Sequence, residues 1–133
     1  MKTKENKPII EITNALVINM IHDVRGQKVM LDFELAELYG YSTKAFNQQV
    51  KRNLERFPND FMFEITSNEV IACARSQFVT SEMKLKGTND GGRTSLPYAF
   101  TEQGVYMLMT VLKGEIAVKQ SIALIKADAL TSR

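Results

Sequence analysis

The sequence predicts an α+β fold, in which a small sheet of short hairpin strands packs with about five helices, two of them forming a helix-turn-helix-like pair. Short apolar runs bounded by turn residues occur at several places, which is typical of short strands. Longer segments carry apolar residues three and four positions apart behind Ser, Thr or Asp, which is typical of capped helices. The 133 residues, 44% of them hydrophobic, are enough for one core of this kind.

The first part of the chain is predicted to be a tail followed by a hairpin. Residues 1–11 are polar or charged for most of their length and are expected to be disordered, whereas residues 12–130 are expected to form a single domain. Apolar residues flank a turn around Arg25-Gly26. We therefore predict one strand at 16–22 and its hairpin partner at 28–31.

Two short helices are predicted to follow the hairpin. Asp32 is placed to cap the first helix, and Gly40 is placed where a left-handed residue would end it. Ser42 or Thr43 caps the second helix, which is expected to run to about Arg56. Two helices joined by a short glycine-containing turn are the sequence signature of a helix-turn-helix.

The remaining elements alternate between strands and helices. Pro97 lies within one predicted strand, which we therefore expect at the edge of the sheet. Ser67 and Thr101 are predicted helix caps. The predicted apolar stripe of the last helix consists of Val118, Ile122, Ile125 and Ala129. The expected strands lie at 61–65, 78–79 and 96–100, the expected helices at 67–75, 101–114 and 115–130, and a glycine-rich loop at 80–92.

The charge of the chain is unevenly distributed. The formal net charge is only +2, but residues 41–56 carry four basic residues against Glu55 alone. On the second predicted helix the apolar stripe contains Phe46, Val50, Leu54 and Phe57. The opposite face is basic and rich in amides, whereas a solvated helix more often pairs acids with bases four residues apart. This pattern favours a nucleic-acid partner.

Each residue of this face has a predicted role on double-stranded DNA. Lys44, Asn47 and Gln48 lie in the first turns of the helix, where a recognition helix meets base edges in the major groove. Lys51, Arg52 and Arg56 are expected to contact phosphates, which gives affinity without sequence information. Arg93 follows the glycine-rich turn and is expected to contact the flanking backbone.

The sequence offers little for catalysis, metal binding or secretion. Cys73 lies in an apolar helical run and is expected to be a core residue, and His22 is expected to be structural. No phosphate-binding loop, dinucleotide fingerprint or zinc-protease motif occurs. No apolar stretch has the length of a signal-peptide core or a membrane span. We therefore expect a non-enzymatic cytoplasmic protein without a cofactor or a membrane partner.

The chain resembles the ORF-6-N domain family of phages and prophages, part of the KilA-N superfamily of DNA-binding domains. The resemblance rests on three runs that together extend over most of residues 12–127: VRGQKVMLDFELAELYGYSTKAFNQQVKRNLERFPNDFMFEIT, RSQFVTS and GGRTSLPYAFTEQGVYML. It implies a small α+β DNA-binding domain of antirepressor-like or regulatory character, which a variable C-terminal domain usually follows. By this resemblance the protein is associated with the bacterial nucleoid, and the chain is either a minimal form or lacks such a C-terminal domain.

Two functional hypotheses follow. The first is sequence-specific binding of double-stranded DNA in transcription regulation, with the second helix in the major groove. The alternative is a protein-interaction regulator that binds a repressor or another phage or host regulatory protein through its C-terminal helices. A homodimer is compatible with either hypothesis, and the apolar surface at 106–111 is its predicted interface.

Overall fold

A four-stranded antiparallel sheet joins the two halves of the chain in the computed structural model, which describes residues 10–76 and 96–127. The strand order is β1-β2-β4-β3. Met30 of β2 and Met62 of β3 both lie opposite Phe100, so that β4 is held between segments far apart in the sequence. The strands are β1 His22–Val24, β2 Gln27–Leu31, β3 Met62–Glu64 and β4 Tyr98–Phe100.

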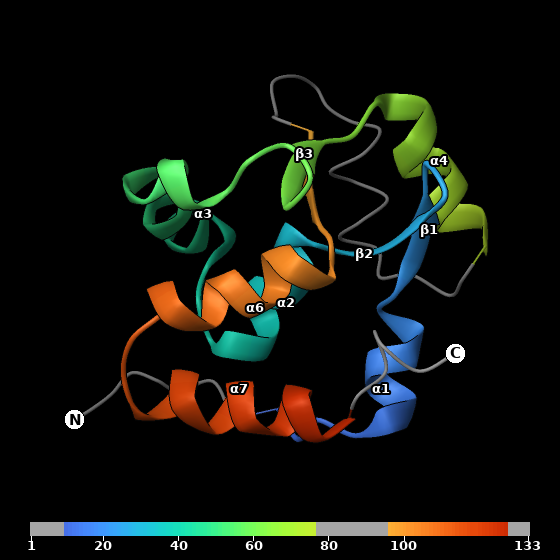
Figure 1. Ribbon diagram of the computed structural model, residues 1–133. Helices are drawn as coiled ribbons and strands as arrows, with labels where there is room; N and C mark the ends of the chain where they lie inside the picture. The colour runs from blue at the N-terminus through green and yellow to red at the C-terminus, as the bar shows by residue number, and fades with distance from the viewer. Residues whose placement is uncertain (1–9, 77–95, 128–133) are drawn as a thin grey trace.

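Helices surround this sheet and confirm the predicted α+β class. Figure 1 shows α6 between α3 and α7, while α3 and α4 lie at opposite ends of the fold. The predicted strand at 78–79, the loop at 80–92, Arg93 and Ala129 lie outside the described residues. The helices are α1 Asn14–Asn19, α2 Asp32–Tyr39, α3 Thr43–Arg52, the 3-10 turn η1 Leu54–Arg56, α4 Ser67–Ser76, α6 Glu102–Val111 and α7 Glu115–Ala127.

The prediction of a strand at 16–22 is wrong for most of its length. Thr13 accepts a hydrogen bond at its hydroxyl from the Leu16 amide (3.1 Å) and so begins the short helix α1, which contacts α7. The hairpin itself is confirmed, but its first strand begins only at His22. Arg25 and Gly26 form the turn with φ of 54° and 77°, the left-handed values that the favoured two-residue hairpin turn requires.

The predicted edge position of the Pro97 strand is also wrong. β4 begins one residue after Pro97 and is a central strand between β2 and β3. The Pro97 carbonyl accepts a hydrogen bond from the Ile65 amide (3.0 Å). Pro97 therefore precedes the strand, at a position where its missing backbone N–H is not needed for a hydrogen bond to a neighbouring strand.

Alternation along the central strands divides the core into two clusters. Met30 and Phe100 face α2, α3, α6 and α7, whereas Leu31 and Ala99 face the side covered by α4. Cys73 of α4 is buried in the second cluster, as expected for a core cysteine. The cap of α4 is Thr66 rather than the predicted Ser67.

The beginning of α6 lies directly against the backbone that precedes β3. Thr101 is the predicted cap, and its hydroxyl both accepts from the Gly104 amide (3.4 Å) and donates to the Asp60 carbonyl (2.8 Å). A Cβ added at Gly104 would collide with the Phe61 carbonyl oxygen. Glycine at this position thus permits the close approach of α6 to that segment.

The predicted inward stripe of the last helix is wrong. Val118, Ile122 and Ile125 are exposed, while Ala117, Gln120 and Leu124 face the core. The reason is the buried amide of Gln120, whose nitrogen donates to the carbonyls of Leu38 (2.8 Å) and Ile10 (2.8 Å). These two bonds fix the rotation of α7. They also hold Ile10, which the sequence assigned to the tail.

Candidate nucleic-acid interface

The turn between α2 and α3 has the geometry that its residues predict. Gly40 has a left-handed φ of 75° and ends α2, and its amide bonds back to the Glu37 carbonyl (3.1 Å). Ser42 then caps α3, because its hydroxyl accepts from the Ala45 amide (3.1 Å). The two helices are therefore joined by only three residues, which keeps their relative orientation tight.

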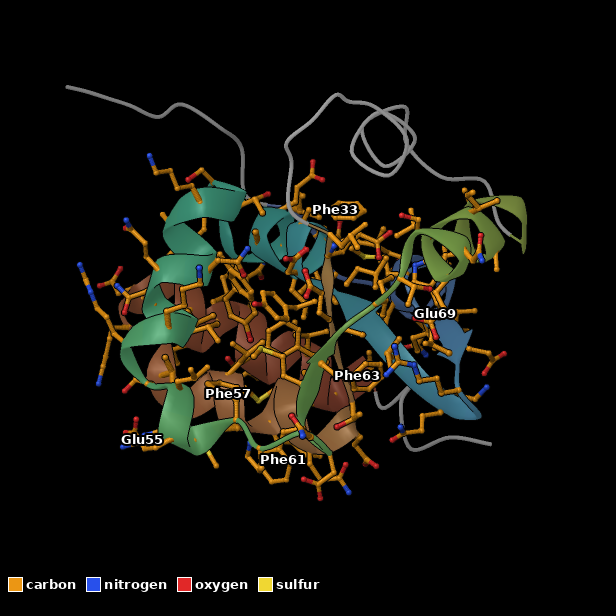
Figure 2. The ribbon with its side chains drawn as sticks, turned by 90° about the horizontal axis from the view of Figure 1, so that it is seen from above. Phe33, Glu55, Phe57, Phe61, Phe63 and Glu69 are labelled. Atoms are coloured by element: carbon orange, nitrogen blue, oxygen red, sulfur yellow. The ribbon has the colours of Figure 1, made fainter. Side chains whose placement is uncertain are left out.

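The inner face of α3 is anchored by aromatic contacts. Phe46 and Val50 are buried, and the Phe46 ring meets Phe100 edge to face with centroids 5.9 Å apart. Phe57 packs on the same Phe100 ring in the same manner and points inward in Figure 2.

The helix ends earlier than predicted. The α-helix stops at Arg52, and Asn53, with φ of −126°, precedes the 3-10 turn η1. The change in helical period turns Leu54 outward, and its side chain is 53% exposed although the sequence placed it in the inner stripe.

The outer face of α3 carries cations that are exposed. Lys44, Gln48, Lys51 and Arg52, which we call the basic face, are all exposed, and Figure 2 shows nitrogen-tipped side chains that project away from the fold here. Among the described residues, none of the three cations forms an ion pair. The hairpin cations differ, since Arg25 pairs with Glu69 (2.7 Å).

Arg56 lies beyond the end of α3 on η1. Its Nη1 donates to the Thr110 hydroxyl (3.3 Å), so this exposed side chain is directed toward α6. The structure thus brings Lys44, Asn47, Gln48 and Lys51 together around one hollow, with Arg56 set apart on η1.

A buried carboxylate fixes α3 against the sheet. Asp32 is only 4% exposed, and its Oδ2 accepts hydrogen bonds from the Asn47 side-chain nitrogen (3.1 Å) and from the Tyr98 amide (3.2 Å). The prediction that Asp32 is the N-cap of α2 is wrong, because Leu31 holds that position and Asp32 is the first helical residue. Asp32 instead connects α2, α3 and β4. We call Asp32, Asn47 and the Tyr98 amide the carboxylate clamp.

The clamp leaves Asn47 with one unsatisfied atom. Its Oδ1 is buried and has no hydrogen-bond partner among the described residues. Asn47 is therefore half-buried and already uses its amide nitrogen within the protein. Of the two amides predicted to read bases, only Gln48 is fully exposed.

A hollow of about 500 Å³ lies beside the basic face. One wall consists of Lys44, Gln48 and Lys51 together with Asn47, and the facing wall includes Phe33, Leu96, Pro97 and Tyr98. Figure 2 shows Phe33 between the ends of the fold that carry α3 and α4. This facing wall could not be predicted from the sequence, because its residues become neighbours of α3 only through the sheet.

The histidine that the sequence assigned a structural role is part of a buried polar cluster. His22 is 2% exposed, and its Nε2 lies 3.0 Å from the Glu34 carboxylate. Burial alone would lower the pKa of His22, but hydrogen bonds with Cys73 and Glu34 outweigh it and raise that pKa to about 9. The raised pKa favours the charged form of this imidazole, which β1 carries at its first residue.

Other kinds of site find no support in residues 10–76 and 96–127. Within those ranges no three His, Cys, Asp or Glu side chains are grouped so that they could hold a metal ion. Nor does any helix there combine the length and apolar character needed to cross a membrane.

Comparison with known proteins identifies a domain family. The ORF6N domain matches this chain over residues 19–111, a range that contains the hairpin, both helices of the pair, the clamp and all of α6. No curated protein and no solved structure matches the chain.

Proposed function

The chain belongs to the ORF6N domain family, a family of phage-type regulatory domains, and from this premise we propose that it binds double-stranded DNA sequence-specifically through α3. The observation that carries the proposal is the basic face, whose three cations lack acidic partners among the described residues. Cations left unpaired on one helix are suited to phosphates, which they reach without first breaking an ion pair.

Each residue has a definite role in this proposal. Gln48 is exposed and can make a bidentate contact with adenine, and Lys44 reaches guanine or a phosphate. The side-chain nitrogen of Asn47 donates to Asp32, so a bidentate contact of Asn47 with adenine requires that hydrogen bond to open. We assign the phosphate contacts to Lys51, Arg52 and Arg56, and a contact with the flanking DNA backbone to Arg93. The protein acts in the bacterial cytoplasm as an antirepressor-like regulator and performs no catalysis.

Selection from a random duplex library, repeated at two salt concentrations, tests this proposal. We expect an enriched site at both concentrations, with weaker retention at the higher one because counterion release drives phosphate binding. Symmetry within the enriched site would report a dimer. Failure to retain any duplex at low ionic strength would refute the proposal.

A second function is favoured by α7. Val118, Ile122 and Ile125 form an exposed apolar stripe on this helix, and such stripes are typical of surfaces that bind a helical partner. The stripe supports the alternative that a regulatory protein binds the C-terminal helices. Ile122→Glu should then abolish capture of that protein and leave DNA binding intact. Loss of DNA binding in the same variant would argue against two separate surfaces.

A further inference from the structure

The hollow beside the basic face has two chemically different walls. The α3 wall carries two ammonium groups seven residues apart and two side-chain amides, whereas the facing wall includes Phe33, Leu96, Pro97 and Tyr98. Its volume of about 500 Å³ lies in the range of small-ligand pockets. A helix that only enters a groove of DNA needs a projecting ridge and has no use for a hollow of this size.

We propose that this hollow binds a single nucleotide whose base carries an exocyclic amino group. A nucleotide combines an anionic phosphate with a flat base. The basic wall can bind the phosphate, and the apolar wall can pack against the base. Lys44 and Lys51 are placed for the phosphate, and the apolar wall around Tyr98 is placed for the face of the base.

The preference for an amino group comes from an acceptor in the hollow. Glu64 lines the hollow, and its exposed carboxylate is an acceptor that a bound base can reach. A base amine that donates to this carboxylate forms a charge-assisted hydrogen bond. A carbonyl at the same position of the base faces Glu64 and gains no hydrogen bond from it.

The same carboxylate argues against a simple phosphate site. Glu64 repels an anion, and Asp32 lies buried behind it, so the hollow suits a phosphate only at the lysine rim. Adenine, cytosine and guanine nucleotides satisfy these requirements, and thymine and uracil nucleotides do not. Such a nucleotide has two sources, which are the free cellular pool and a base turned out of bound DNA. The second source rests on the proposed function.

The test compares cytosine with uracil, because the two bases differ only at C4 and N3. Cytosine has an amino group at C4 and no proton on N3, whereas uracil has a carbonyl at C4 and a proton on N3. In the first arm, dCMP and dUMP are titrated into the ¹⁵N-labelled protein. We expect dCMP to shift the amide resonances of Leu96 and Tyr98 and to bind about tenfold more tightly than dUMP. In the second arm, fluorescence anisotropy compares a fully paired duplex with duplexes that carry one unpaired cytosine or one unpaired uracil.

Preference for unpaired cytosine in the second arm identifies DNA as the source, and preference for dCMP in the first arm alone identifies the free nucleotide. Equal binding of cytosine and uracil in both arms overturns the inference. Fully paired duplex binding is measured in the same titrations. If the protein binds the fully paired duplex but shows no cytosine preference in either arm, the proposed function is supported and the nucleotide pocket is refuted. If the protein does not bind the duplex but still binds dCMP, the pocket is supported and the proposed function is refuted.

Leu96→Trp fills the hollow without changing any charge. It should abolish the cytosine preference and keep affinity for the fully paired duplex within about twofold. Tyr98→Leu is the second variant, since it removes the aromatic face and keeps the backbone amide that Asp32 requires. Circular dichroism verifies the fold of both. A cytosine preference retained by both folded variants would place the nucleotide elsewhere and overturn the inference.

Discussion

Removal of two cations from the basic face should change the salt dependence of DNA binding by a calculable amount. The described part of the interface offers four cations for phosphates, namely Lys44, Lys51, Arg52 and Arg56. With about 0.9 counterions released per contact, the slope of log affinity against log salt is about −3.6 from these four. Affinity should therefore fall about 150-fold between about 50 and about 200 mM salt.

The double variant Lys51→Ala/Arg52→Ala leaves two of the four contacts. Its slope should be about −1.8, and the same increase in salt should cost only about 12-fold in affinity. Fluorescence anisotropy over a salt series measures both slopes. The variant should weaken every duplex to a similar extent, because phosphate contacts carry no sequence information.

The matched control is Lys119→Ala/Lys126→Ala, which removes the same charge from exposed positions of α7. Figure 1 places α7 on the other side of α6 from α3, so this pair should leave the slope unchanged. An equal reduction of the slope in both double variants would show that net charge alone governs binding. That result would refute the assignment of the interface to α3.

Three further predictions concern the fold that supports the interface. His22 is protonated in the folded state because its pKa is raised to about 9, so its contribution is complete below about pH 6.5 and is lost as pH rises through 9. Urea unfolding should show a loss of up to about 3 kcal/mol over that interval, and Glu34→Gln should flatten the profile. Gly104→Ala should destabilise by about 1–3 kcal/mol or more, because the added Cβ meets a backbone carbonyl; an unchanged urea midpoint would contradict that contact. Asp32→Ala should cost about 2–4 kcal/mol in the same assay, since it leaves two buried donors unpaired, whereas the exposed Asp23→Ala should cost less than about 1 kcal/mol.

Features set by neighbours in the chain could be predicted from the sequence. Gly40, Ser42 and Thr101 have the capping roles that their types indicate, because a cap depends on residues within four positions. The inner residues Phe46 and Val50 follow from helical spacing. The exposed cations follow from the same spacing, so the residues of the basic face could be predicted from the sequence. The residues that surround this face could not.

Features set by distant partners could not be predicted. Asp32 has the type and position of a cap, but it bonds to Asn47 and to Tyr98, which lies 66 residues away. The stripe of α7 was assigned to the wrong side because Gln120, a polar residue, is the one that turns inward. The apolar run from Leu16 fits a strand and a helix equally well, and contact with α7 decides between them.

Because of the carboxylate clamp, α3 becomes oriented only late in synthesis, after β4 has been made. The ribosome completes α3 well before β4, and until Tyr98 has emerged Asp32 lacks the donor that this residue supplies. Phe100, the ring on which Phe46 packs, is made later still. A nascent chain therefore carries all the cations of α3 before the residues that orient this helix exist. The basic face acquires its fixed shape only when β4 joins the sheet.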